Sequence, residues 1–256
     1  ILFKMFVKFL SLVTIFVYTV NAQTDYCDPD LCPKHTKHVG CGARDSTGPK
    51  CPPKTEVWEM TDDLKNMILD IHNANRSTIA TGNLGHYEPA DKMPTLVWSD
   101  ELAKLAFYNL NNCEYGHDKC RNTKKFAYAG QNIAKSNGIG YDFQANDMIP
   151  LFISKWFAEY HDADQTVIDA YHDIEGVQVG HFTQIVSGKT TEVGCAALKF
   201  TDAKNDKKQS VQFTCDYAVT NIVDAPVYTT GDPCSSCTKG CNNQYPGLCN
   251  IGEPTL

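Results

Sequence analysis

The sequence predicts an α+β fold that is held together by disulfides. Three stretches carry apolar residues at the spacing of helices, and two later stretches have the β-branched and aromatic composition of strands. All 12 cysteines follow an apolar leader, which indicates an oxidising compartment and six disulfides. The middle of the chain, residues 61–224, is long enough to bury one sizeable core.

Residues 1–22 have the pattern of a secretory signal peptide. Lys4 and Lys8 introduce an apolar run over residues 9–20, and a small-residue cleavage site makes Gln23 the expected mature start. The run is shorter than the roughly 20 residues that a membrane-spanning helix needs. We therefore expect a secreted, extracellular protein without a transmembrane anchor.

The charge of the chain argues against nucleic acid as a partner. Removing the leader takes two of the 23 basic residues and none of the 30 acidic ones, which leaves a net charge of −9. Phosphate and anionic membranes are bound by clustered Lys and Arg, and an acidic chain opposes such binding.

Composition divides the mature chain into three regions. Residues 23–60 hold four Cys and five Pro with little apolar periodicity, so disulfides rather than a core must order this N-terminal extension. Residues 61–224 carry the helices and strands, and residues 225–256 form a second Cys-rich tail. The Cys234-x-x-Cys237 spacing would also suit a metal, but no His flanks it and the compartment favours disulfides.

Three helices are expected in the middle region. Thr61 caps the first, and Ser99 caps the second. The third covers about residues 144–160, where Pro150 either delays its start or kinks it. The apolar faces are Leu64, Met67, Ile68 and Ile71, then Leu102, Leu105, Ala106, Leu110 and Cys113, and finally Met148, Leu151, Phe152, Trp156 and Tyr160.

Two strands are expected near residues 193–200 and 211–219, joined by a hairpin loop over the polar segment 201–209. Cys195 and Cys215 would then lie on neighbouring strands and could bridge them.

Four segments carry a resemblance to a known family. They are IHNANR at 71–76, YGHDKC at 115–120, GQNIA at 130–134 and GHFTQIV at 180–186, with Trp156 and Glu159 between the last two. In this order and spacing they resemble the CAP superfamily of cysteine-rich secretory, antigen 5 and pathogenesis-related proteins. The Cys-rich ends are similar to antigen 5-related proteins of flies, such as the salivary allergens of horseflies.

The resemblance implies a monomer with a three-layer α-β-α sandwich, a central antiparallel sheet and disulfide-stapled extensions. It also implies the disulfides, each of which contributes about 2–4 kcal/mol. These are Cys27–Cys41, Cys32–Cys120, Cys51–Cys113 and Cys195–Cys215, to which Cys234–Cys241 and Cys237–Cys249 are added for the tail.

The cavity of the family gathers two His and two acidic residues, and the matching positions here are His117, Gln131, Glu159 and His181. Gln131 departs from the usual Glu. Two imidazoles and one carboxylate still suffice for a divalent metal such as zinc with an open position for water, although no cofactor is required. The alternative is a polar, water-filled cleft.

Two further positions depart from the family pattern, and neither changes the expected fold. Ser187 replaces the usual Trp, and Asp216 replaces the more usual Asn. The remaining histidines lack such context and are expected at the surface. They are His35, His38, His86, His161 and His172.

The sequence gives no sign of an enzyme. A Gly-x-Ser-x-Gly elbow and a His-Glu-x-x-His motif are both absent, and six disulfides would leave no free Cys as a nucleophile. A Ser-His-Asp triad is a spatial arrangement that chain order does not test. A metal-dependent hydrolase therefore remains only an alternative.

The resemblance implies that the protein scavenges small hydrophobic ligands, such as fatty acids or eicosanoids, and so modulates host haemostasis or inflammation. Family members hold such lipids between two long helices. The matching groove would consist of Met67, Ile68, Ile71, Phe143, Met148, Phe152 and Phe157. The competing interpretation is that this apolar stripe is ordinary core.

A host extracellular protein is the alternative partner. The disulfide loop Cys41 to Cys51 holds Arg44 and Asp45, which could bind an integrin or a platelet receptor and inhibit it. No Gly separates the two residues, unlike in an Arg-Gly-Asp ligand. Asn75 begins a glycosylation sequon, which predicts a glycoprotein if the residue is accessible.

Overall fold

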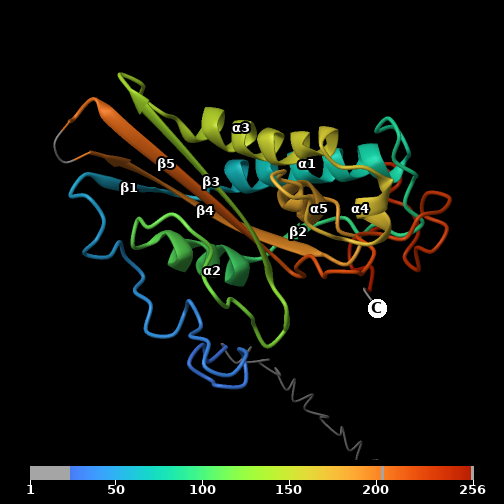
Figure 1. Ribbon diagram of the computed structural model, residues 1–256, viewed down its shortest axis with the longest axis horizontal. Helices are drawn as coiled ribbons and strands as arrows, with labels where there is room; N and C mark the ends of the chain where they lie inside the picture. The colour runs from blue at the N-terminus through green and yellow to red at the C-terminus, as the bar shows by residue number, and fades with distance from the viewer. Residues whose placement is uncertain (1–23, 203–204, 255–256) are drawn as a thin grey trace, which may run out of the picture.

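The computed structural model describes residues 24–202 and 205–254. The expected signal peptide lies outside the described residues. A central sheet is covered on one face by α2 (Asp100–Leu110) and on the other by α1 (Asp62–Ala80) and α3 (Ala145–Ala158) (Figure 1). This arrangement confirms the expected α-β-α sandwich.

The sheet is built around two long neighbouring strands, β4 (Glu192–Thr201) and β5 (Lys208–Tyr217). On the far side of β5 lies β3 (Gly130–Ile139), and on the far side of β4 lies β1 (Thr55–Trp58), all antiparallel. The short β2 (Val97–Trp98) pairs with β4 in parallel. The two strands expected from the sequence are thus the centre of the sheet.

The helix starts agree with the cap residues of the sequence. Thr61 is the N-cap of α1, where its hydroxyl accepts a hydrogen bond from the Leu64 amide at 3.3 Å. Ser99 is the N-cap of α2, although its side chain makes no capping bond. Pro150 lies inside α3. The shorter helices are η1 (Glu159–His161), α4 (Gln165–Asp169) and α5 (Gly180–Ile185).

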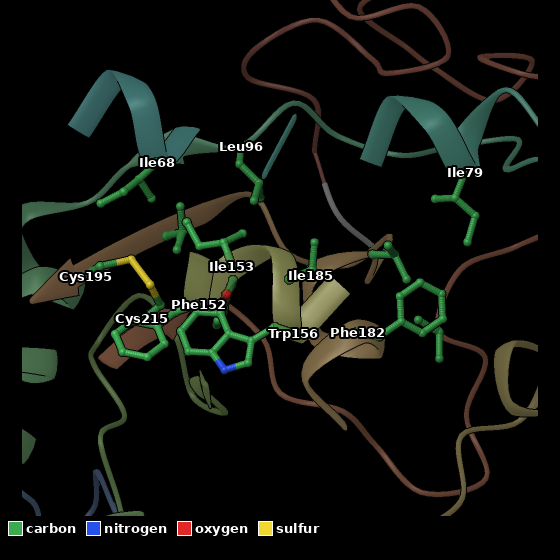
Figure 2. Close-up of a cluster of buried hydrophobic side chains, with 14 of the residues drawn as sticks. Ile68, Ile79, Leu96, Phe152, Ile153, Trp156, Phe182, Ile185, Cys195 and Cys215 are labelled. Carbon is green, nitrogen blue, oxygen red and sulfur yellow. A yellow bond between two sulfur atoms is a disulfide. The ribbon is translucent and has the colours of Figure 1, made fainter. Parts of the chain in front are cut away.

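The main core fills the space between the sheet and the layer of α1, α3 and α5 (Figure 2). Trp156 of α3 stacks on Phe213 of β5 with ring centroids 5.3 Å apart, and its indole N–H donates to the Ile133 carbonyl at 3.3 Å. The Cys195–Cys215 disulfide lies in this core and joins directly opposed residues of β4 and β5. Helix α5 is therefore fixed against the same core as the sheet.

Five disulfides are formed, and they join the expected cysteines. They are Cys27–Cys41, Cys32–Cys120, Cys51–Cys113, Cys195–Cys215 and Cys237–Cys249.

The sixth expected pair differs, because Cys234 and Cys241 are free thiols. The tail is closed without them, by the Cys237–Cys249 disulfide and by backbone pairing of Cys241 with Cys249. Within this closed tail the Cys234 thiol donates to the Leu248 carbonyl at 3.5 Å.

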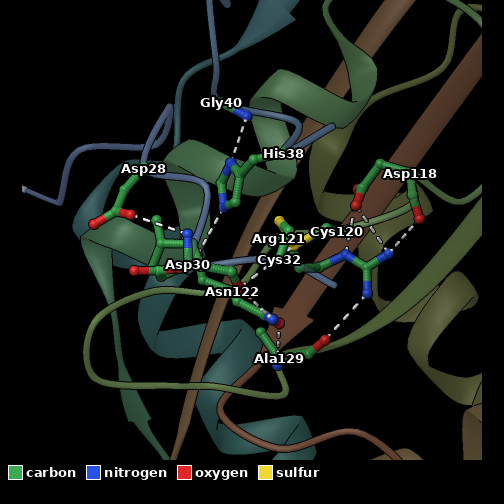
Figure 3. Close-up of a disulfide and its surroundings, with 11 residues drawn as sticks. Asp28, Asp30, Cys32, His38, Gly40, Asp118, Cys120, Arg121, Asn122 and Ala129 are labelled. Carbon is green, nitrogen blue, oxygen red and sulfur yellow. Dashed lines mark hydrogen bonds and ion pairs between the residues drawn. A yellow bond between two sulfur atoms is a disulfide. The ribbon is translucent and has the colours of Figure 1, made fainter. Parts of the chain in front are cut away.

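The N-terminal extension is fastened to the loop after α2 (Figure 3). His38, which the sequence placed at the surface, is only 3% exposed. Its Nε2–H donates to the Asn122 carbonyl at 2.7 Å, and its Nδ1 accepts from the Gly40 amide at 2.9 Å. These backbone partners compensate for its burial, which lowers the pKa of His38.

Candidate functional site

A cleft of about 380 Å³ opens between the start of β3, the first turn of α5 and the loops at 171–179 and 220–221. His117, Gln131 and His181 line it, as the sequence predicted. Glu159 does not line the cleft but lies against the far side of His181. The structure therefore brings two imidazoles and one amide together, with the carboxylate behind them.

His181 is held by Glu159 at the N-terminus of α5. The Glu159 carboxylate accepts from the backbone amides of His181 and Phe182 at 2.9 and 3.1 Å, and from His181 Nδ1 at 2.6 Å. The Trp156 indole stacks on the His181 ring with centroids 5.7 Å apart. Since Glu159 uses both oxygens in this way, it orients His181 and leaves Nε2 as the ring nitrogen that does not contact Glu159.

His117 is held in the same manner by an amide. Its Nδ1 donates to Gln131 Oε1 at 2.8 Å, so the Nε2 atom of the neutral ring carries a lone pair. Although His117 is exposed, partial desolvation lowers its pKa, and the charges of Arg121 and His181 act in the same direction. The imidazole is therefore neutral at pH 7.

Behind Gln131 lies a polar network that the sequence analysis did not foresee. It contains Asp118, Arg121 and Asp216, and the Arg121 guanidinium lies 3.0 Å from the Asp118 carboxylate. Burial raises the pKa of Asp216 well above its usual range. The available signals were that Asp118 lies within the YGHDKC segment and that Asp216 departs from the family pattern.

His117 and His181 line the same cleft, and neutral imidazole nitrogens are common ligands of divalent metals such as zinc. Among the described residues, the one group of three His, Cys, Asp or Glu with ligand atoms within 4.8 Å of one another is Cys32, His38 and Cys120. Those two sulfurs are joined in a disulfide (Figure 3), so they offer no thiolate.

The residues expected to form an apolar groove lie on α1 and α3, which run side by side (Figure 1), except for Phe143, which lies just before α3. Three of its residues belong to the core, since Ile68 is 0%, Met148 5% and Phe152 2% exposed. The others are partly buried and pack against that core, namely Met67, Ile71, Phe143 and Phe157. Only this second set is placed to contact a ligand without opening the core.

In the loop between Cys41 and Cys51, the Asp45 carboxylate is already engaged by α2. It accepts from the Tyr108 hydroxyl at 2.7 Å and lies 3.6 Å from Lys104 Nζ. The exposed Arg44 lines a second cleft, of about 500 Å³, between the extension and residues 108–118. The loop therefore does not present Arg44 and Asp45 as a free pair.

The sequon at Asn75 lies within helix α1. Asn75 is partly buried, and the Ser77 hydroxyl donates to the Pro246 carbonyl of the tail at 2.6 Å. Glycosylation here remains a prediction, and it would have to precede the docking of the tail.

None of the helices in the described part of the chain is long and apolar enough to cross a membrane.

Comparisons with known proteins give a consistent result. A model described as the cysteine-rich secretory protein family (CAP) matches residues 69–217. Venom allergen-1 of Aedes albopictus is 40% identical over 243 residues, covering 94% of this chain and 93% of that protein. The antigen 5 like allergen Cul n 1 of Culicoides nubeculosus is 37% identical over 209 residues, covering 77% and 94%.

Solved structures have the same fold. The crystal structure of Na-ASP-1 has a TM-score of 0.63 and 27% identity, covering 80% of this chain and 51% of that chain. The crystal structure of NaASP2 with Zn²⁺ has a TM-score of 0.61 and 24% identity, covering 78% of this chain and 99% of that chain.

Proposed function

The chain belongs to the cysteine-rich secretory protein family, among its antigen 5-related members, and from this premise we propose that it is secreted and acts by binding rather than by catalysis. Its relatives are named venom allergens and antigen 5 like allergens, and these names support secretion. The disulfides at both ends support an oxidising compartment.

The proposed ligand is a small apolar acid, such as a fatty acid or an eicosanoid, whose capture would modulate host haemostasis or inflammation. The observation that carries this proposal is a set of partly buried apolar residues on α1, on α3 and just before α3, namely Met67, Ile71, Phe157 and Phe143. Met and Phe side chains form adaptable apolar pockets. The disulfides would limit the ordering cost of binding.

The test is calorimetric titration of the native protein with fatty acids and cysteinyl leukotrienes. We expect a negative heat-capacity change, because apolar surface is buried. Phe157→Ala should weaken binding. Leu151→Ala, which truncates a residue of the same helix that is 43% exposed, should leave binding unchanged. Equal affinity of both variants, or no heat and no quenching of Trp fluorescence, would remove the lipid proposal.

A second proposal concerns a divalent metal such as zinc in the cleft. It is supported by the two histidines that line one cleft with their Nδ1 atoms already bonded. Zinc affinity should fall as pH drops below about 6.5, where a free imidazole takes a proton. Joint replacement of His117 and His181 by Ala should abolish zinc binding, while His172→Ala, at an exposed position outside the cleft, should leave it unchanged.

Lipid binding should survive EDTA, because these apolar residues are not among those that line the His cleft. A lipid affinity that falls with metal removal would place both ligands in one site and contradict the two-site proposal.

A further inference from the structure

The side-chain amide of Gln131 lies between His117 and two carboxylates, and every bond that it can make is made. Its Oε1 accepts from His117 Nδ1 at 2.8 Å and from Arg121 Nη2 at 3.4 Å. Its Nε2 donates to Asp118 Oδ2 at 2.8 Å and to Asp216 Oδ1 at 2.9 Å. An amide has two donors and two acceptor positions, so this one is saturated.

These neighbours decide which way the amide faces. An ionised carboxylate only accepts hydrogen bonds, and a guanidinium only donates. If the amide turned over, its oxygen would face the Asp118 carboxylate and its NH₂ would face the Arg121 guanidinium. The oxygen of Gln131 is therefore held toward His117.

The position of Asp216 is set by strand register. Gln131 of β3 and Asp216 of β5 are directly opposed residues, and the Asp216 side chain is fully buried. Asp118 follows His117 in the chain and is fixed by the ion pair with Arg121 (Figure 3).

The same register makes two departures from the family pattern depend on each other. A carboxylate at position 131 could not donate to Asp118 Oδ2 and Asp216 Oδ1 as the Gln131 amide does, and it would be repelled by the Asp118 carboxylate that pairs with Arg121. With an acid at position 216, an amide at position 131 is the compatible partner.

We propose that Asp118 and Asp216 are positioning residues for His117, which act through the Gln131 amide to keep the proton of the neutral imidazole on Nδ1 and the lone pair on Nε2. The inference deepens the metal site proposed above. The zinc titration described below depends on the proposed metal site. The NMR test does not, because the tautomer of His117 can be measured without metal.

The test is ¹H–¹⁵N NMR of the histidine rings in the metal-free, full chain at about pH 8, above the usual imidazole pKa. We expect His117 as the Nδ1–H tautomer. Joint replacement of Asp118 and Asp216 by Ala should shift His117 to the other tautomer or to a mixture. Asp216→Asn should preserve the native signature, because its side-chain oxygen still accepts from Gln131.

His181 is the control within the same molecule, because Glu159 rather than Gln131 fixes its proton. The inference is overturned if His117 keeps its tautomer in the double variant, or if His117 and His181 change together. Should the double variant not fold, Asp118→Ala alone, in the loop outside the sheet, gives the same reading.

Zinc titration of Asp118→Ala separates the two proposals. We expect about 10-fold weaker binding, as is typical when a residue behind a metal ligand is lost. A native protein with the Nδ1–H tautomer but no zinc binding removes the metal proposal and leaves the positioning role. A native His117 with its proton on Nε2 overturns the positioning role even if zinc binds.

Discussion

Arg76 is the residue whose loss we expect to damage this fold most, and Arg76→Met is the substitution that tests it. The side chain is fully buried in α1. Its guanidinium donates to the carbonyls of Ile185 and Ser187 at 2.8 Å each and to that of Pro94 at 2.6 Å. Arg76 thus ties the end of α5 to the chain that leads into β2.

The cost of the substitution follows from these three short bonds. Each hydrogen bond from a charged donor contributes about 1.5–3 kcal/mol, so their sum is about 5–9 kcal/mol. Removing a buried charge regains part of its desolvation cost, which is several kcal/mol. We therefore expect a net loss of about 3–5 kcal/mol in the free energy of unfolding.

Urea denaturation with the disulfides intact measures this loss. Arg44→Met is the matched control, because Arg44 is exposed and its guanidinium makes no hydrogen bond or ion pair within the described residues. The control should change stability by less than about 0.5 kcal/mol. A loss below about 1 kcal/mol for Arg76→Met, or equal losses for the two variants, would refute the reasoning.

Three further predictions concern single positions. Burial lowers the pKa of His72 from 6.5 to about 4. The free energy of unfolding should therefore fall by about 3 kcal/mol as the pH drops from 6.5 to 4, because the unfolded state takes up the proton first. Urea denaturation at both pH values should show a smaller fall for His72→Gln. Cys234 and Cys241 are free thiols, and burial together with the neighbouring Cys241 raises the pKa of Cys234. Mild oxidation should close the two into a disulfide, and peptide mapping that pairs either with another Cys would contradict this. Gly194→Ala should destabilise by about 1–3 kcal/mol or more, because a Cβ there would lie 2.3 Å from the Ser99 carbonyl oxygen; unchanged thermal unfolding would count against it.

The sequence predicted the elements that rest on local pattern. Apolar spacing and the Thr61 cap gave α1, and β-branched runs gave β4 and β5, because periodicity and capping are properties of neighbouring residues. Strand β3 was not predicted, since its sequence contains Lys, Ser, Asn and two Gly and its stability comes from pairing with β5 along its whole length.

Burial of polar side chains was the least predictable feature. His38 is buried because the carbonyl of Asn122, 84 residues away in the chain, accepts from its ring. No local pattern encodes such a contact. For the same reason, the sequence identified His117 and His181 but gave Glu159 a place in the cleft, whereas it lies behind His181.

The N-terminal extension has little core of its own, and its contacts indicate what it contributes. Three contacts fasten the extension to the loop after α2, and one of them is the Cys32–Cys120 disulfide (Figure 3). The Val39 amide donates to the Cys120 carbonyl at 2.8 Å, and the Asn122 side-chain amide donates to the Leu31 carbonyl at 2.8 Å. His117 lies in that loop, three residues before Cys120. The inner side of the loop is held by Arg121, which donates to the Ala129 carbonyl at 3.1 Å. The loop is thus clamped from both sides, and a cleft histidine on an otherwise exposed segment gains a fixed position because the extension is stapled over it.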